Sequence, residues 1–305
     1  MKTVLKLGIL AGAGAAAYAG IRRLTAPVEL PRPPGTMLTI KGEQIHLIDR
    51  GEGPAVLLLH GFGGNTFSWR FVMDDLARAH RVVAFDLPGF GFSDRSPELE
   101  YGHSAQAERV IAVMDELGID RAVLVGHSMG GGILQRVAAT HPGRVEKLVL
   151  VGSVNAAEPD PGRRDAGRAM MRVMTFAQKA PSLCLIGGKF GLNRTVADPG
   201  LVDETMVKGY MAPLLLPGTV EAIFAMAERV RDEAPVDLGQ IAAPTLILQG
   251  AVDSVVPVAT AEALHAGIGG SKLVTVPGAA HMLAEEDPAA FLAAVTEFID
   301  SPAAG

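Results

Sequence analysis

The segment Gly126-His127-Ser128-Met129-Gly130 constrains the fold of this 305-residue chain more than any other. The apolar run before it, Ala122-Val123-Leu124-Val125, is typical of a buried parallel strand. Residues 131–139 after it predict a helix that ends near His141-Pro142. The two flanking glycines allow close backbone contact at a sharp turn, so the pattern predicts a Ser128 hydroxyl exposed at the top of a sheet.

A serine in this position can attack a carbonyl carbon if the chain supplies three partners. An alcohol is a poor nucleophile at neutral pH unless a base takes its proton, and an imidazole, with an ordinary pKa near ~6.5, suits that task. A carboxylate on the other ring nitrogen fixes the tautomer and stabilises the imidazolium. The developing oxyanion needs two aligned donors, and the N-terminus of the following helix also favours negative charge there.

Strands and helices alternate along most of the chain. Residues 37–40 and 44–49 flank a turn and predict an antiparallel hairpin, and further strands are expected at 55–59, 81–85, 122–125, 145–151, 245–249 and 272–276. Helices are expected at 65–77, at 104–117 with Ser104 as its cap, and at 258–266 and 288–299. This order predicts the α/β class, with a mostly parallel eight-stranded sheet between helices. Functional residues should then lie beyond the carboxyl ends of the strands.

Residues 153–235 interrupt this alternation and are mainly helical in pattern. Six of the twelve methionines lie there, which are Met170, Met171, Met174, Met206, Met211 and Met226. Such an insertion predicts a helical cap above Ser128, with residues 35–152 and 236–305 forming the core. Methionine fills irregular cores and also forms adaptable walls for acyl chains, so both interpretations stay open. The candidate substrate-binding residues are Met170, Met174 and Met211 in the cap and Trp69 in the core, although Trp69 equally suits core packing.

The first 34 residues have the pattern of a membrane anchor or a signal sequence. Lys2 and Lys6 precede an Ala/Gly-rich apolar run that ends at Ile21 and is followed by Arg22-Arg23 and a proline-rich stretch. The run approaches the ~17–25 residues of a spanning helix. We expect membrane association through this segment, and export after signal cleavage is the alternative. In either case the segment should lie outside the fold.

Composition limits the classes of partner and cofactor that the chain is expected to bind. The net charge of −6 gives no electrostatic basis for binding nucleic acid. The single cysteine, Cys184, excludes an internal disulfide. Histidines and cysteines are not clustered at metal-ligand spacing, so we expect neither a metal nor another cofactor. The oligomeric state is left open by the sequence.

Five stretches resemble the α/β-hydrolase fold family, in particular its single-cap serine esterases and lipases. They are His60–Gly63, Asp86–Gly91, Gly126–Gly130, Gly250–Asp253 and Gly278–His281, and the resemblance extends over about residues 37–299. It implies the α/β-hydrolase fold and a Ser, Asp, His order of catalytic residues.

Residue by residue, the resemblance implies that Ser128 is the nucleophile, Asp253 the acid and His281 the base. Position suggests the backbone N–H groups of Phe62 and Met129 as the oxyanion hole. Glu158 and Asp160 stay open as rival acids, because some relatives are expected to place the acid in that loop.

Several reactions share this fold, so the site residues must decide between them. Epoxide hydrolases and haloalkane dehalogenases resemble the chain but use an aspartate nucleophile, whereas position 128 is serine. We therefore predict a serine hydrolase that cleaves lipophilic carboxylic esters, such as a monoacylglycerol-like lipid, through an acyl-enzyme. A cofactor-free haloperoxidase, a carbon–carbon hydrolase and an acyltransferase on the same triad stay open, as does a hydrolase-like ligand receptor.

Overall fold

The computed structural model describes residues 34–158, 181–230 and 233–302. Except for Pro34, the predicted N-terminal anchor lies outside these ranges. The candidate pocket residues Met170 and Met174 and the rival acid Asp160 lie outside them as well.

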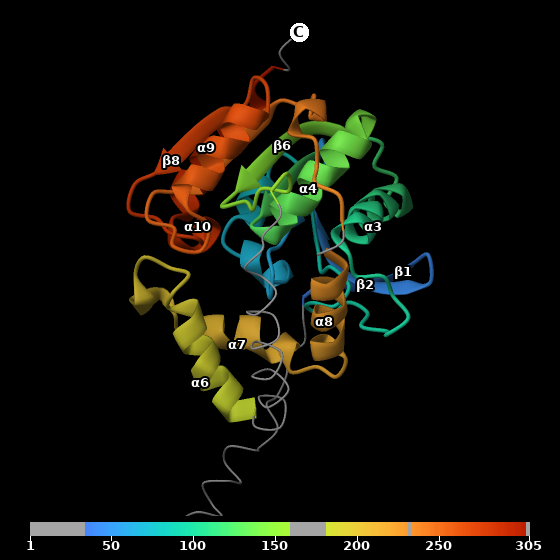
Figure 1. Ribbon diagram of the computed structural model, residues 1–305, viewed down its shortest axis with the longest axis vertical. Coiled ribbons are helices and arrows are strands. Elements are labelled where there is room, and N and C mark those ends of the chain that lie inside the picture. The colour runs from blue at the N-terminus through green and yellow to red at the C-terminus, as the bar shows by residue number, and fades with distance from the viewer. Residues whose placement is uncertain (1–33, 159–180, 231–232, 303–305) are drawn as a thin grey trace, which may run out of the picture.

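The centre of the molecule is an eight-stranded sheet in the order β1-β2-β4-β3-β5-β6-β7-β8 (Figure 1). Its strands are β1 (Thr36–Ile40), β2 (Glu43–Arg50), β3 (Ala55–Leu59), β4 (Arg81–Phe85), β5 (Ala122–His127), β6 (Val145–Val151), β7 (Thr245–Gly250) and β8 (Lys272–Val276). The β1–β2 and β2–β4 pairs are antiparallel and the others are parallel. The predicted α/β class with a mostly parallel eight-stranded sheet between helices is therefore confirmed.

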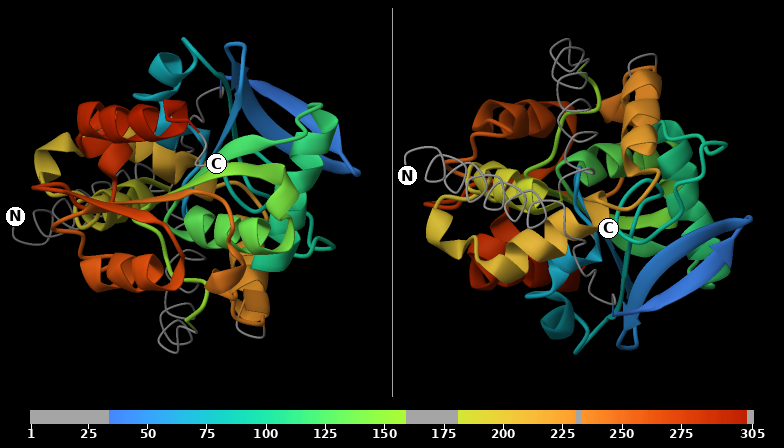
Figure 2. Two further views of the ribbon diagram at one scale, coloured as in Figure 1. Left: turned by 90° about the horizontal axis from the view of Figure 1, so that it is seen from above. Right: turned by 90° about the horizontal axis from the view of Figure 1, so that it is seen from below.

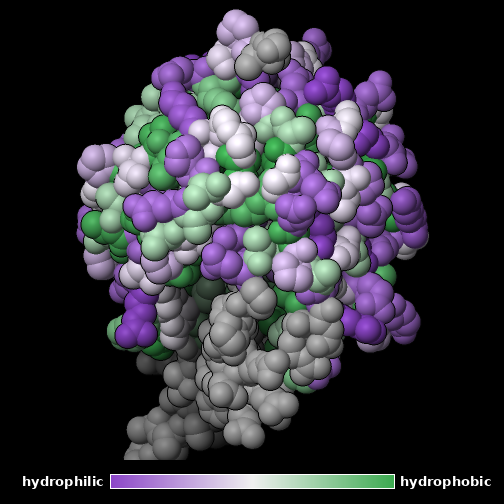
Figure 3. Space-filling model, turned by 45° about the horizontal axis from the view of Figure 1, so that its top comes forward, coloured by the Kyte–Doolittle hydropathy of each residue, from purple (hydrophilic) through white to green (hydrophobic). Residues whose placement is uncertain are grey.

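Helices cover both faces of this sheet (Figure 2). One face packs against α3 (His103–Glu116), α4 (Met129–Thr140) and α9 (Val258–Gly267), and the other against α2 (Met73–Leu76) and α11 (Pro288–Asp300). Successive strand residues alternate between the two layers: Leu57 and Leu59 belong to the first, and Val56 and Leu58 to the second. These apolar strand residues are buried in the core. On the face drawn in Figure 3, polar residues predominate.

Two predicted helix boundaries are wrong, each because a distant residue intervenes. The helix expected at 65–77 is broken into the 3₁₀ helix η1 (Thr66–Trp69) and the short α2. The Phe67 carbonyl accepts from Arg70 Nη1 at 3.1 Å, and Glu285, 215 residues later, holds that guanidinium through two 2.7 Å hydrogen bonds. Ser104 lies inside α3 and does not cap it. Instead, its backbone N–H donates to Glu233 Oε1 at 2.8 Å.

The described part of residues 153–235 contributes α6 (Pro181–Leu192), η3 (Pro199–Leu201), α7 (Glu204–Leu214) and α8 (Thr219–Val230). These helices lie together on one side of the sheet (Figure 1). Asn65 Nδ2, in the loop after β3, donates to the Gly209 carbonyl of α7 at 3.1 Å, and Arg95 Nε, in the loop after β4, donates to Thr219 Oγ1 of α8 at 2.8 Å. The insertion thus rests on loops that leave the carboxyl ends of the strands, and its division from the core as a cap stays a prediction.

The remaining short helices are η2 (Pro142–Arg144), η4 (Leu238–Gln240) and α10 (Leu283–Glu286). Within the described ranges, no single helix is long and apolar enough to cross a membrane.

Candidate active site

Ser128 lies at a strained turn between β5 and α4. Its backbone has φ 52° and ψ −118°, in the left-handed region that residues with a side chain rarely adopt. Close packing enforces this turn: a Cβ on Gly126 would lie 2.7 Å from Gly131 Cα, and one on Gly130 would lie 2.5 Å from the carbonyl oxygens of Leu59 and His60. The glycines that flank Ser128 are therefore required by backbone contacts, as the motif predicted.

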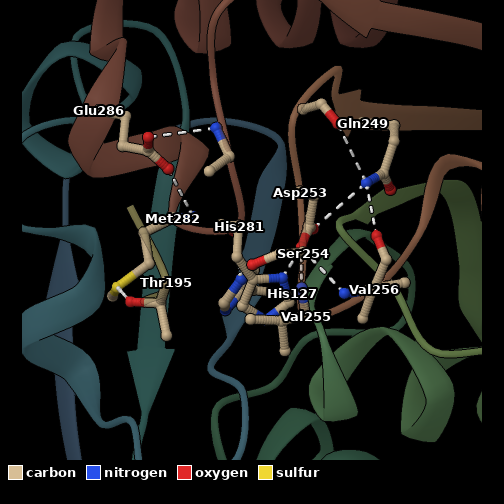
Figure 4. Close-up of polar contacts among 12 residues, drawn as sticks. His127, Thr195, Gln249, Asp253, Ser254, Val255, Val256, His281, Met282 and Glu286 are labelled. Carbon is tan, nitrogen blue, oxygen red and sulfur yellow. Dashed lines mark hydrogen bonds and ion pairs between the residues drawn. The ribbon is translucent and has the colours of Figure 1, made fainter. Parts of the chain in front are cut away.

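Asp253, after β7, and His281, after β8, form a buried pair (Figure 4). His281 Nδ1 donates to Asp253 Oδ2 at 2.8 Å, and Asp253 Oδ1 accepts from the amides of Val255 and Val256, each at 2.8 Å. Burial alone would raise the pKa of Asp253, but the His281 and amide hydrogen bonds outweigh it and lower that pKa. A carboxylate at this position favours the tautomer with the proton on Nδ1, which leaves Nε2 to face the reaction as the acceptor.

The end of β6 connects this pair to Ser128. The Ser128 amide donates to the Val151 carbonyl at 2.9 Å. A Cβ on the next residue, Gly152, would lie 3.3 Å from both Asp253 Oδ2 and His281 Nδ1. The structure therefore brings the three predicted catalytic residues to one edge of the sheet.

The rival acid Glu158 is placed differently. Its side chain is exposed and accepts from Asn155 Nδ2 at 3.1 Å. Within the described residues, Asp253 is thus the acid that contacts His281.

The loop after β3 lies directly against the serine. A Cβ on Gly61 would lie 2.9 Å from Ser128 Cβ. The buried His60 ring fixes this loop, because its Nδ1 donates to the Gly61 carbonyl at 2.7 Å and its Nε2 accepts from the Leu87 amide at 3.0 Å. Burial lowers the pKa of His60, so the ring is neutral. Phe62 directly follows Gly61 in this loop and Met129 directly follows Ser128 at the start of α4, so the oxyanion hole built from their N–H groups stays a prediction.

His127 contacts the candidate base directly. Its ring centroid lies 4.6 Å from that of His281, and its Nε2 donates to the His281 carbonyl at 2.8 Å. Burial and the neighbouring His281 imidazole lower the pKa of His127 to about 3. The neutral His127 ring therefore anchors the His281 loop without adding charge to the site.

Two polar residues that the sequence analysis did not single out support the pair. Gln249, fully buried at the end of β7, donates from Nε2 to Asp253 Oδ2 at 3.2 Å and to the Val256 carbonyl at 3.0 Å. Glu286 accepts hydrogen bonds from backbone amides beside His281. The position of Gln249 within an apolar strand indicated a buried polar role, whereas the local sequence pattern did not indicate the role of Glu286.

Of the candidate pocket residues, Trp69 and Met211 lie within the described ranges, and both pack against apolar neighbours. Trp69 is 1% exposed and packs against Phe291, with ring centroids 6.2 Å apart, although it also lines a small cavity with His127. Met211 of α7 packs over Gly188 of α6. A role in substrate binding stays a prediction for both. No group of residues within the described ranges could hold a metal ion.

Comparisons by sequence and by structure lead to the same protein family. A family model described as the alpha/beta hydrolase fold matches residues 54–186, and one described as TAP-like protein matches residues 225–304. A 2-hydroxy-6-oxo-2,4-heptadienoate hydrolase from Pseudomonas putida is 30% identical over 87% of this chain and 96% of its own length.

Solved structures agree. A meta-cleavage product hydrolase from Pseudomonas fluorescens superimposes with a TM-score of 0.75 and 26% identity, covering 87% of this chain and 97% of its own. An esterase from Exiguobacterium antarcticum superimposes with a TM-score of 0.75 and 25% identity, covering 88% of this chain and all of its own. The chain therefore belongs to the α/β-hydrolase fold family and is a hydrolase.

Proposed function

We propose that the protein is a serine hydrolase that cleaves apolar carboxylic esters through an acyl-enzyme on Ser128. The observation that carries the proposal is the buried Asp253–His281 pair beside a serine held at a strained turn. In such an arrangement each group has a defined task, because the acid fixes the imidazole tautomer and the imidazole accepts the serine proton.

The proposed reaction has two halves. Ser128 Oγ attacks the ester carbonyl while His281 Nε2 takes its proton, and the oxyanion lies between the N–H groups of Phe62 and Met129. The tetrahedral intermediate then expels the alcohol, which takes the proton from Nε2. Water attacks the acyl-enzyme with Nε2 as the base, which releases the acid and restores the Ser128 hydroxyl.

The exposed aromatic ring of Phe62 favours an uncharged, apolar acyl group. Phe62 is 52% exposed on the loop that contacts Ser128. A dienoate would bring a carboxylate that needs a cation. Arg70 is bound by Glu285 through two hydrogen bonds, and Arg95 donates to the Ser93 carbonyl and Thr219. These two guanidiniums are thus engaged within the protein.

A carbon–carbon hydrolase is the second candidate. It is favoured by the 30% identity, over nearly the whole length, to an enzyme named for a 2-hydroxy-6-oxo-2,4-heptadienoate substrate. The same serine, histidine and aspartate would serve that reaction as well.

Kinetics with two substrate classes distinguish these candidates. We expect p-nitrophenyl esters of four to eight acyl carbons to give a kcat/KM at least about 100-fold above that of a 2-hydroxy-6-oxo-dienoate, with Ser128→Ala as the blank. A preference of similar size for the dienoate would establish the second candidate. Turnover of neither substrate above the blank would reject both. Adding glycerol tests for acyl transfer, since a transferase would form glycerol ester in place of free acid.

We also propose that residues 1–34 associate with a membrane, which would bring lipid esters to the site. The support is the apolar run between basic residues near the N-terminus. Fractionation of cells expressing the full chain and residues 35–305 tests this: the full chain should sediment with membranes and the shorter chain should not. Recovery of both in the soluble fraction would reject membrane association.

A further inference from the structure

A single carboxylate, that of Glu286, holds the backbone on both sides of His281. Glu286 is the last residue of α10, and its side chain turns back toward the histidine (Figure 4). Oε2 accepts from the Ala280 amide at 3.1 Å, and Oε1 accepts from the Met282 amide at 2.9 Å. Since these residues immediately precede and follow His281, the carboxylate sets the path of the chain through the candidate base.

The same carboxylate binds the insertion. Glu286 Oε2 also accepts from the Ala197 amide at 2.7 Å, in the segment between α6 and η3. Two residues earlier, the Thr195 carbonyl accepts from the His281 amide at 3.0 Å, and Thr195 Oγ1 lies 3.0 Å from Met282 Sδ. Residues 195–197 are therefore docked on the His281 loop, with Glu286 joining the two segments.

The contacts of His281 itself come from three separate parts of the chain. Its amide is bound by the insertion through Thr195, its carbonyl by β5 through His127, and its ring by the loop after β7 through Asp253. Glu286 Oε2 accepts from both Ala197 and Ala280, so this carboxylate ties the insertion directly to the loop that carries His281.

Helix capping does not account for these contacts. The bond to Met282 satisfies the amide that precedes α10, as capping would. The bonds to Ala280 and Ala197 involve residues outside the helix, so they add nothing to its stability as a helix. They act instead on the histidine loop and on the insertion.

We propose that Glu286 is a positioning residue. It holds His281 in place relative to Ser128 and couples the position of His281 to the docking of residues 195–197. The proposal rests on the proposed function, because it assigns His281 as the base. A displacement of about 1 Å at a reacting group can cost about 100-fold in rate, so a small shift of this loop has a measurable effect.

The test compares Glu286→Gln and Glu286→Ala with Glu297→Gln, which removes an exposed carboxylate of α11 paired with Lys272 at 3.0 Å. With p-nitrophenyl butyrate we expect kcat to fall about 10- to 100-fold in Glu286→Gln and further in Glu286→Ala, with KM within about twofold. Glu297→Gln should match the wild type. Labelling of Ser128 by a fluorophosphonate should slow in proportion to kcat. Glu286→Gln keeps the volume and one acceptor oxygen, so it remains informative if Glu286→Ala does not fold.

The outcomes separate the two proposals. An active wild type with Glu286→Gln at the kcat of the Glu297→Gln control would overturn the positioning role and leave the proposed function intact. A lower melting temperature with unchanged kcat per folded molecule would also overturn it, in favour of a purely structural role. A wild type that neither hydrolyses esters nor reacts with the fluorophosphonate would instead reject the proposed function.

Discussion

The two sides of the site are held in place by different forces. On the serine side, backbone packs against backbone, with Gly126 and Gly130 at distances that exclude even a methyl group. On the histidine side, hydrogen bonds from the loop after β7, from β5 and from the insertion converge on His281. The difference teaches that the nucleophile is fixed by close backbone packing around a glycine-flanked turn, whereas the base is fixed by hydrogen bonds from three other segments of the chain. Substitutions should therefore damage folding on the first side and activity on the second.

Ser128→Ala is the exception on the serine side and the largest expected effect. The Ser128 hydroxyl makes no capping hydrogen bond to α4, so its loss should change the free energy of unfolding by less than about 0.5 kcal/mol. Turnover of p-nitrophenyl butyrate should fall about 10⁶-fold because the nucleophile is gone. Steady-state kinetics and thermal melts measure the two quantities, and turnover close to the wild type would remove Ser128 from the mechanism.

Asp253→Asn should cost less activity, about 10⁴-fold in kcat, because the amide favours the wrong tautomer of His281. The contribution of Asp253 to folding stability depends on pH with a defined sign. The folded pKa of Asp253 is lowered, so the carboxylate stabilises the fold above the unfolded pKa of about 3.9 and loses this effect as the pH falls below it.

Urea melts of both proteins between pH 3 and 5, the range in which Asp253 is titrated, test that sign. The stability difference between wild type and Asp253→Asn should shrink as the pH falls from about 5 to 3. A difference that grows on acidification would contradict the contacts assigned to this carboxylate.

Gly130→Ala should mainly lower the free energy of unfolding. Its methyl group would lie 2.5 Å from two backbone oxygens, which have no rotamer by which to move away, so we expect a loss of about 3 kcal/mol or more. Gly143→Ala is the matched control, since nothing lies within 4 Å of its added methyl group. Equal melting temperatures for the two variants would show that the turn is not packed as described.

Gln249→Ala is the smallest expected effect. Asp253 would keep its hydrogen bonds to His281, Val255 and Val256, so kcat should fall by less than about tenfold, and the free energy of unfolding by about 1–2 kcal/mol. Gln240→Ala, on an exposed side chain, is the control. A loss as large as that of Asp253→Asn would mean that Gln249 takes a direct part in the reaction.

The same contrast explains what the sequence could predict. The strands and the serine turn were predicted because local alternation of apolar residues and close glycine packing determine them. The break at Arg70 and the capping of α3 by Glu233 were missed, because both depend on partners more than a hundred residues away. Asp253 and His281 were predicted from flanking motifs, but the contact of Glu286 with Ala197 exists only once the insertion has folded onto the core.

A crystal structure of the protein after reaction with a p-nitrophenyl phosphonate tests the central claim most directly. We expect phosphorus bonded to Ser128 Oγ, a phosphoryl oxygen about 2.7–3.1 Å from the N–H groups of Phe62 and Met129, and His281 Nε2 within hydrogen-bond reach of the adduct. Phosphorus on another residue, or an adduct on Ser128 with His281 turned away from it, would contradict the account.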